Sequence, residues 1–448
     1  MKKRIAVVGA GIAGLSCAYE LQKQGFEVVV FEQDDHVGGR MWTSEKKGFA
    51  FDVGADFLVD LYKNTRSYCD ELGIGHAWQP MGPGKHYTLN AGGLRLLSIS
   101  SIWSVLGFDS LSFKSRIRLI LFLARAGAKI RGLNFFDLAS APEELDMDNA
   151  YAYARDQIGQ DVAEYIVDGI TTTYQFHRSS EISTTGMFAL AGLTANSSEG
   201  FTMYHTIGEM RTIPCELAKR LDVRTKTQVS RIEPHKGKVA ITATGKRMKF
   251  DTVVCASTGD RAREMLIKPS RKQAELLASV RYASSINISY KIPVEVLSGI
   301  SAVTVPHIEN PSISGYTNES LKGICVDGKT LINVYLHEGW ARKMMKKSEK
   351  EIFTQVKGEL VKVCPPLDGR KELLEDHEIQ RWPSAMPKFD HKYVTRVKRF
   401  WQDGQGDNGV YLCGDYLNTP WVEGSITCGK KVAAMIAIGE KGSGRRAS

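Results

Sequence analysis

The sequence predicts an α/β protein built around a parallel sheet, and three observations support that class. The first 32 residues form a strand, a glycine-rich turn, a helix and a second strand. Residues 252–256 form a continuous apolar run, which is typical of a strand buried on both faces of a parallel sheet. A further strand is expected at residues 410–413, close to the C-terminus. The sheet is therefore predicted to gather distant parts of the chain.

The glycine-rich turn after the first strand reads GAGIAG and matches a dinucleotide-binding pattern. Gly9 permits a tight turn, Gly11 lets the backbone approach a pyrophosphate, and Gly14 lets the helix pack closely on the strand. Ile12 and Ala13 lie where that helix begins, and its free N–H groups and partial positive charge would face the phosphates. This unit predicts a bound dinucleotide.

Glu32 ends the second strand, where a carboxylate can accept hydrogen bonds from both ribose hydroxyls. Because a carboxylate there would repel a 2′-phosphate, the ligand should be FAD or NAD and not NADP. A loop follows in which Gly38 and Gly39 precede Arg40. The glycines allow close backbone approach and the guanidinium can clamp a phosphate, although a plain solvent loop would have the same sequence.

The middle of the chain contains two further features. Residues 48–57 are expected to form a strand that runs into a turn of small residues, including Gly54 and Ala55, against which a flat group could lie. From about 80 to 200 the chain is expected to be helix-rich. Residues 113–125 predict an apolar helix edged with arginines, which either rests in a membrane interface or lies in the core with its basic groups at the surface.

Near the C-terminus, Gly414 and Asp415 follow the strand at residues 410–413, and a helix of small residues is expected from Thr427. The start of this helix would present free N–H groups to a carbonyl that gains negative charge on reduction.

Three other segments are expected to be irregular. Residues 404–409 also match the dinucleotide pattern, but they precede a strand and open no helix, so they predict a turn. The Pro-punctuated residues 381–387 predict a loop, and residues 441–448 predict a disordered tail.

Length, composition and charge limit the classes of protein to which this chain can belong. A chain of 448 residues is long enough for two or more domains. No segment has the roughly 18 uninterrupted apolar residues of a transmembrane helix, and no export signal is recognised. The 8 cysteines are scattered without metal or redox spacing, which predicts free thiols, no metal and a cytoplasmic protein. The net charge of +9 comes with no nucleic-acid motif, so no nucleic-acid partner is expected.

Taken together, these blocks resemble the FAD-dependent superfamily of flavin monoamine oxidases, protoporphyrinogen oxidases and phytoene-type desaturases. The resemblance spans nearly the whole chain, and it implies one FAD site and a small-molecule substrate. The nucleotide half of that site would comprise Gly9, Gly11, Ile12, Ala13, Gly14, Glu32, Gly39, Arg40 and Val229. The flavin half would comprise Gly54, Ala55, Trp382, Gly414, Asp415, Val422, Ser425 and Ile426.

The resemblance also assigns roles to some of these residues. Val229 would pair its backbone with the adenine, and Arg40 and Asp415 would each contact a phosphate or the ribityl chain. Ser425 and Ile426 would offer N–H groups to the C2 carbonyl side of the flavin. The family's chemistry is hydride transfer from a substrate C–H bond to flavin N5, so no side-chain base is required.

The subfamily is less clear from the sequence. Similar amine oxidases carry a lysine on a strand beside flavin N5, whereas residues 283–288 contain none. They also flank the flavin with two aromatic residues. Trp421 matches one of them and would shape the approach of the substrate, but no aromatic stands at Met386 or Pro387 to match the other. Residues 381–387 instead resemble porphyrinogen oxidases, and Gly414-Asp415-Tyr416 resembles desaturases.

These observations predict a Rossmann-type FAD-binding domain with an inserted substrate-binding domain of mixed sheet and helices. The FAD-binding domain would comprise residues 1–80, 201–280 and 395–440, and the substrate-binding domain residues 81–200 and 281–394. The expected activity is FAD-dependent oxidation of a C–H bond in a bulky, largely apolar or polycyclic substrate, such as a porphyrinogen or a polyene. The alternatives are oxidation of an amine or amino-acid derivative, a redox-neutral flavoenzyme, and a flavin-free binding protein that resembles GDP-dissociation inhibitors. Peripheral membrane contact and oligomeric state stay open.

Overall fold

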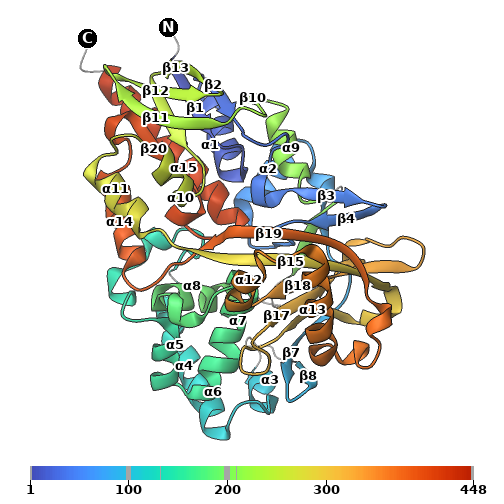
Figure 1. The fold of residues 1–448 in the computed structure, drawn as a ribbon. Helices are drawn as coiled ribbons and strands as arrows, with labels where there is room; N and C mark the ends of the chain where they lie inside the picture. The colour runs from blue at the N-terminus through green and yellow to red at the C-terminus, as the bar shows by residue number, and fades with distance from the viewer. Residues whose placement is uncertain (1–2, 97–101, 132, 196–201, 208, 445–448) are drawn as a thin grey trace.

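The computed structural model describes residues 3–96, 102–131, 133–195, 202–207 and 209–444. In the view of Figure 1, the upper part holds both termini and a parallel sheet, and the lower part holds a mixed sheet beside a group of helices. Two long strands, β15 and β19, cross the molecule between these parts.

The parallel sheet has five strands in the order β10-β2-β1-β14-β20. Every neighbouring pair in it is parallel. Its strands are β1 (Arg4–Val8), β2 (Glu27–Phe31), β10 (Asp222–Arg224), β14 (Thr252–Cys255) and β20 (Val410–Leu412). All four residues of β14 are buried, as its apolar run predicted. The predicted α/β class and its Rossmann-type first unit are confirmed.

Two helices from opposite ends of the chain pack together beside this sheet, α1 (Ile12–Lys23) and α15 (Val422–Gly444). They approach closely at Gly429, where a Cβ atom would lie 2.5 Å from the carbonyl oxygen of Ala13. Because α15 begins at Val422, the predicted start at Thr427 was wrong. The helix also continues through residues 441–444, where disorder was expected, and residues 445–448 lie outside the described residues.

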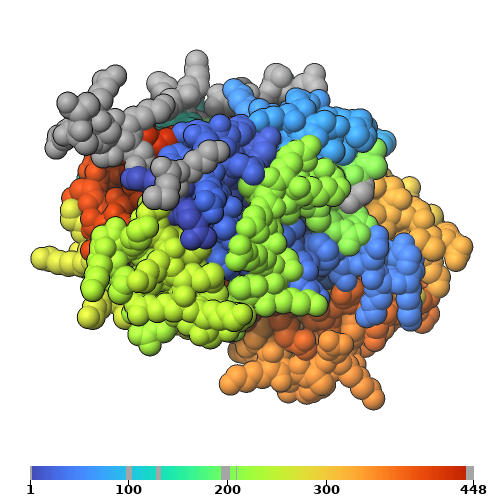
Figure 2. Space-filling view, turned by 90° about the horizontal axis from the view of Figure 1, so that it is seen from above, coloured from blue at the N-terminus to red at the C-terminus, as the bar shows by residue number. Residues whose placement is uncertain are grey.

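A three-stranded meander borders the parallel sheet and comprises β11 (Val229–His235), β12 (Lys238–Ala243) and β13 (Lys246–Phe250). From above, its yellow-green surface lies beside the blue N-terminal segment (Figure 2). The chain passes directly from one sheet to the other at two places, from β10 to β11 and from β13 to β14. Between β10 and β11 it turns at Lys226, which has a φ of 51°.

The mixed sheet has seven strands in the order β19-β15-β18-β17-β16-β7-β8. They are β7 (Lys85–Asn90), β8 (Gly93–Leu96), β15 (Tyr282–Pro293), β16 (Ile300–Thr304), β17 (Ile313–Asn318), β18 (Lys329–Leu336) and β19 (Glu375–Pro387). Helix α13 (Glu349–Val363) covers one face, where Ile352 and Val356 join the same apolar cluster as Ile286 and Ile288 of β15. This sheet supplies much of the wall of the site described below.

In the described part of residues 80–200 helices predominate, as predicted, and the hairpin β7–β8 at its start is the exception. Its turn residues Ala91 and Gly92 have φ values of 47° and 76°, which suit a tight hairpin turn. One expectation in this region was wrong. Residues 381–387, expected to form a loop, are the end of β19. Pro383 is tolerated because β19 is an edge strand and its pairing with β15 shifts register between Ala283 and Ser285.

The helical group lies below the parallel sheet. It contains α3 (Ile102–Gly107), α4 (Phe113–Arg131), α5 (Ala150–Gln157), α6 (Gln160–Val162), a π-helical turn (Ala163–Asp168), α7 (Gly169–Gln175) and α8 (Thr184–Ala195). Helix α4 confirms the helix predicted at residues 113–125. Its Phe113, Ile117 and Leu121 are 72%, 38% and 47% exposed, and contact with a membrane stays one of the two alternatives for this helix. Within the described residues, no helix is long and apolar enough to span a bilayer.

Shorter elements complete the fold. The remaining strands are β3 (Thr43–Lys46), β4 (Phe49–Asp52), β5 (Leu58–Val59), β6 (Trp78–Pro80) and β9 (Met203–Thr206). The remaining α-helices are α2 (Lys63–Glu71), α9 (Thr212–Ala218), α10 (Gly259–Met265), α11 (Arg271–Ser279), α12 (Glu338–Met344) and α14 (Tyr393–Asp403).

Candidate cofactor and substrate site

A cavity of about 790 Å³ joins the two parts of the molecule. The predicted site residues that line it are Gly9, Gly11, Ile12, Ala13, Glu32, Gly39, Arg40, Gly54, Ala55, Val229, Trp382, Gly414, Asp415, Trp421, Val422 and Ser425. The two exceptions are Gly14 and Ile426, which lie behind the wall. Residues predicted from both ends of the chain therefore meet at one place.

The first glycine-rich turn has the geometry its sequence predicts. Gly9 has a φ of 108°, and a Cβ atom on Gly14 would lie 2.1 Å from the carbonyl oxygen of Gly9. No atom lies within 4 Å of a Cβ placed on Gly11, so its backbone is open to the cavity. Gly14 thus supports the turn by close packing, as its place in the motif predicts, and it does not itself line the cavity.

The second glycine loop closes over the first. The N–H of Gly38 donates to the carbonyl of Ala10 at 2.9 Å. A Cβ atom on Gly39, whose φ is 54°, would lie 3.7 Å from Gly11 Cα. The two loops form a backbone concavity at the N-terminus of α1, and the residues present there fit a pyrophosphate.

Glu32 lies at the edge of this concavity and is 9% exposed. Its Oε2 accepts the N–H of Ala10 at 2.7 Å, and its Oε1 accepts the N–H of Asp34 at 3.0 Å. Each carboxylate oxygen keeps a second acceptor site. The carboxylate is therefore fixed in place with acceptor capacity left for ribose hydroxyls.

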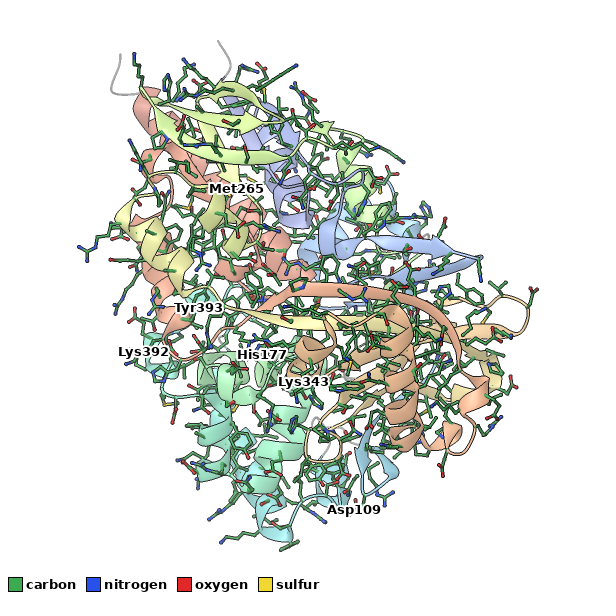
Figure 3. The ribbon with its side chains drawn as sticks, in the orientation of Figure 1. Asp109, His177, Met265, Lys343, Lys392 and Tyr393 are labelled. Atoms are coloured by element: carbon green, nitrogen blue, oxygen red, sulfur yellow. The ribbon has the colours of Figure 1, made fainter. Side chains whose placement is uncertain are left out.

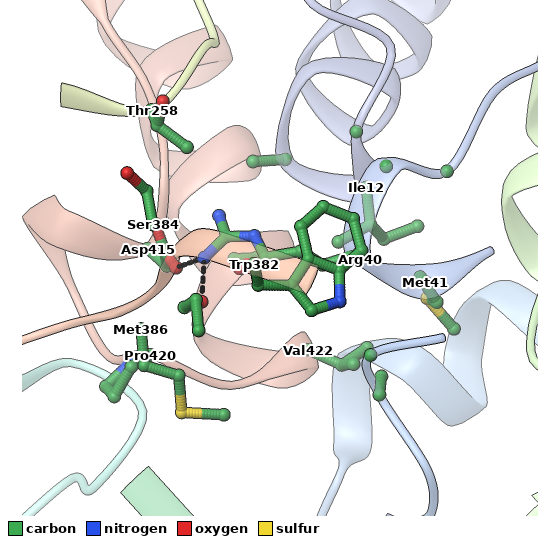
Figure 4. Close-up of a pocket in the computed structure, with 18 of the residues that line it drawn as sticks. Ile12, Arg40, Met41, Thr258, Trp382, Ser384, Met386, Asp415, Pro420 and Val422 are labelled. Atoms are coloured by element: carbon green, nitrogen blue, oxygen red, sulfur yellow. Dashed lines mark hydrogen bonds and ion pairs between the residues drawn. The ribbon is translucent and has the colours of Figure 1, made fainter. Parts of the chain in front are cut away.

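Arg40 and Asp415 form an ion pair in the wall of the cavity (Figure 4). Nη1 of Arg40 donates to Oδ2 of Asp415 at 2.6 Å and to the carbonyl of Ala385 at 2.7 Å. Asp415 is 4% exposed, so this ion pair provides a buried carboxylate with a partner of opposite charge. The sequence placed both residues at the cofactor but gave no sign that they contact each other.

The start of α15 differs from the prediction. The N–H of Ser425 donates to the carbonyl of Trp421 at 2.9 Å, and Ile426 is fully buried. Neither N–H is therefore free for a flavin carbonyl, because the helix already begins at Val422. The first-turn amides of Val422, Glu423 and Gly424 are the ones left without an intrahelical acceptor.

Glu423 fixes the position of this helix start. Its carboxylate accepts the N–H groups of Asn64 and Thr65 at 2.7 and 2.9 Å, and the Thr65 hydroxyl at 2.7 Å. These contacts hold the start of α15 against α2, so the N-terminus of α15 is held in a defined place at the cavity.

The turn after β4 forms another part of the wall. A Cβ atom on Gly54 would lie 2.2 Å from the carbonyl oxygen of Arg40, and that carbonyl accepts the Ala55 N–H at 2.8 Å. The carbonyl of Val53 accepts hydrogen bonds from Trp382 Nε1 at 2.6 Å and from Asn287 Nδ2 at 3.0 Å. Asn287 of β15 also lines the cavity, and it lies within residues 283–288, which contain no lysine.

The lower half of the cavity was largely missed by sequence reasoning. It is lined by Asp56, Phe57, Met81, His86, Thr173, Tyr174, Phe176, Met203, Ser301, Ala302, Tyr316, Thr317 and Tyr335. Most come from α7 and the mixed sheet, and no motif marks them because they are gathered by pairing of distant strands. Met265, which lines the upper part of the cavity, lies well above His177 in the view of Figure 3.

Trp421 and His86 both line the cavity, and each contacts neighbouring side chains. Trp421 packs against Phe135, with ring centroids 4.6 Å apart. His86 contacts Thr304 Oγ1 at 2.9 Å and Tyr174 Oη at 3.1 Å. Burial lowers the pKa of His86 to about 4, so it is neutral at physiological pH.

The fold and this cavity define a protein with a Rossmann-type first unit and a second chamber beside its two glycine loops. The chain belongs to the family described as flavin containing amine oxidoreductase, whose sequence model matches residues 12–437. This membership confirms the resemblance seen in the sequence.

Individual relatives fall in the three subfamilies named above. Protoporphyrinogen oxidase 2 of Arabidopsis thaliana is 32% identical over 170 residues, which cover 37% of this chain and 31% of that protein. The 4,4'-diapophytoene desaturase of Staphylococcus aureus is 44% identical over 68 residues, 15% of this chain and 14% of that protein. Cyclohexylamine oxidase of Brevibacterium oxydans shares the fold, with a TM-score of 0.77 at 16% identity, over 98% of this chain and 100% of that chain. The matched stretches thus span less than a third of either curated relative.

Proposed function

We propose that this protein is a FAD-dependent oxidoreductase that removes hydride from a C–H bond of a bulky, largely apolar substrate. The observation that supports this most is the single cavity that joins the dinucleotide-binding concavity to a chamber lined mainly by aromatic and aliphatic side chains. Bound FAD would supply the hydride acceptor. The glycine loops would hold its pyrophosphate, Glu32 its ribose, and the Arg40–Asp415 pair its central region.

Polyene and porphyrinogen substrates were the first expectation, and the apolar lining supports a hydrocarbon-rich substrate. The charges in the lower chamber add a second candidate, a bulky amine. Asp56 places a carboxylate in the wall, whereas the two arginines of the described lining are ion-paired, Arg40 with Asp415 and Arg261 with Glu264. Asp56 pairs with Lys322, but Lys322 is shared with Asp52 and Glu319, so this group keeps an excess of negative charge that a positively charged amine would offset. The carboxylates of a porphyrinogen would find no unpaired cation in this described lining.

Anaerobic flavin bleaching tests the proposal and separates the candidates. The purified flavoprotein is mixed with a carotenoid polyene, a porphyrinogen or a bulky primary amine such as cyclohexylamine, and the loss of oxidised flavin absorbance is followed. Bleaching by one member supports an oxidoreductase and names its substrate class. A flavoprotein bleached by none of them would instead be a redox-neutral enzyme.

Trp421→Ala is expected to lower the rate of flavin reduction by roughly tenfold or more with little loss of bound flavin, because a misplaced substrate loses productive geometry. Flavin content and reduction rate are measured on the same preparation. Trp103→Ala is the matched control, since Trp103 is 82% exposed. Equal loss of flavin and of rate in Trp421→Ala would remove the substrate-positioning role.

A further inference from the structure

A buried ionic cluster lies directly behind the lower chamber. Nζ of Lys322 lies 2.5 Å from Asp56 Oδ1, 2.7 Å from Glu319 Oε2 and 3.1 Å from Asp52 Oδ2. All four side chains are at most 7% exposed. An ammonium group has three N–H donors, so Lys322 provides one for each carboxylate.

The charges of this cluster do not balance. Three ionised carboxylates around one ammonium leave a net charge of −2 in a buried place, which strongly favours uptake of a proton. Burial, together with the charge of Asp56, raises the pKa of Glu319 to about 8 despite the opposing effect of Lys322. Burial likewise raises the pKa of Asp52.

A hydroxyl group joins this cluster to the cavity wall. Thr317 Oγ1 lies 2.8 Å from Glu319 Oε1 and 3.3 Å from Asp56 Oδ2, and both Thr317 and Asp56 line the cavity. Because a hydroxyl has one proton, it donates to only one of these carboxylates at a time. When Asp56 is protonated, Asp56 can donate to Thr317 while Thr317 donates to Glu319, and the chain of hydrogen bonds is complete.

The other titratable groups of the cavity are less suited to accept a proton from a substrate. His86 is a weak base, because burial lowers its pKa to about 4. Arg40 pairs with Asp415, whereas Asp56 shares the single ammonium of Lys322 with two other carboxylates. Asp260 accepts the Ser384 hydroxyl at 2.6 Å near the opposite end of the cavity. Asp56 is the carboxylate that the lower chamber presents to a substrate.

We propose that Asp56 accepts the proton that substrate oxidation releases, and that Thr317 passes a proton on to Glu319. This inference rests on the proposed function. With bound FAD as the hydride acceptor for the substrate C–H bond, the neighbouring N–H or C–H bond would lose its proton to Asp56 Oδ2. The electron pair of that bond becomes the new double bond, C=N or C=C. Protonated Asp56 then donates to Thr317 Oγ1, whose own proton moves to Glu319 Oε1.

Three other titratable groups near this cluster are Tyr335, His205 and Glu209. Tyr335 of β18 contacts Thr317 at 3.4 Å, and burial raises its pKa well above the usual range, so it stays neutral. Burial and Lys322 lower the pKa of His205 on β9, so it is neutral near pH 8. Glu209, near Asp52, titrates in this range, because burial raises its pKa to about 7. Glu209→Gln is therefore the matched control for Glu319→Gln.

The first test needs no substrate. Infrared difference spectra of the flavoprotein as purified are recorded from pH 6 to pH 10, and the carbonyl band of a protonated carboxyl group is followed. We expect a band that disappears near pH 8, is absent in Glu319→Gln and persists in Glu209→Gln. A spectrum of Glu319→Gln that matches the parent protein would show that Glu319 holds no such proton and would overturn the proposal.

The second test uses the panel member that bleaches the flavin. The reduction rate should rise with pH through about 8, because Glu319 must lose its own proton before it can accept one from Thr317. We expect Glu319→Gln to abolish this rise and to lower the rate at pH 9 about tenfold or more. Thr317→Val should likewise abolish the rise and lower the rate at pH 9, because it removes the hydroxyl that passes the proton on. Thr317→Ser, which has a hydroxyl, should recover the pH dependence.

The outcomes separate this inference from the proposed function. If a substrate bleaches the flavin and the pH profiles of Glu319→Gln and Thr317→Val match that of the parent protein, the proton route is wrong. The proposed oxidoreductase activity is then still supported. If no panel member bleaches the flavin, the proposed function fails, and so does the proton route that rests on it. Near-ultraviolet circular dichroism of each variant checks that the fold is kept.

Discussion

Replacing Lys322 with methionine is expected to lower the free energy of unfolding by about 3–5 kcal/mol. The substitution keeps a side chain of similar length but removes the ammonium group that three buried carboxylates share. Those groups must then either stay charged in a buried place or take up protons. Urea unfolding at pH 7 measures the change, and the loss should shrink at low pH, where the carboxyl groups are protonated.

Lys347→Met is the control for that experiment. Lys347 pairs with Glu351 at 3.0 Å, but both side chains are 46% exposed, so its removal should cost only about 0–1 kcal/mol. Equal destabilisation by the two substitutions would mean that Lys322 does not neutralise a buried cluster in solution.

Replacing Arg40 with methionine should weaken FAD binding by about 2–5 kcal/mol. The change removes a guanidinium from the cavity wall and leaves Asp415 charged and almost fully buried beside the cofactor's expected path. The anionic cofactor would then meet an unpaired carboxylate in place of an ion pair. Fluorescence titration of the flavin-free protein with FAD measures the affinity.

Arg342→Met tests whether loss of any arginine has this effect. Arg342 pairs with Glu338 and is 59% exposed, and it does not line the cavity, so FAD affinity should stay within a factor of two or so. An Arg40→Met protein that binds FAD as tightly as its parent would contradict the role given to the Arg40–Asp415 pair.

Local patterns explain what could be predicted from the sequence. The turn at Gly9 and Gly14 and the apolar run of β14 are visible in sequence because backbone conformation and burial restrict the residues allowed there. The same is true of Glu32, whose place at the end of β2 follows from the length of the first unit. These residues identified both the fold class and the upper half of the cavity.

Features set by contacts between distant segments could not be predicted in this way. The helix α15 begins early because the carboxylate of Glu423 binds the start of α2, although glycine and a β-branched residue are weak helix formers there. Pro383 suggested a loop, but its place on an edge strand allows it in β19. Lys322 meets Asp52 and Asp56 only through the fold, since nothing in the sequence near any of them marks the contact.

A crystal structure of the protein purified with FAD tests the central claim most directly. We expect one FAD in the cavity, with its adenosine ribose at Glu32, its pyrophosphate over Gly11 and its ring between the Gly54–Ala55 turn and Trp421. A colourless protein that takes up no FAD, or a ring bound away from Trp421, would contradict this account.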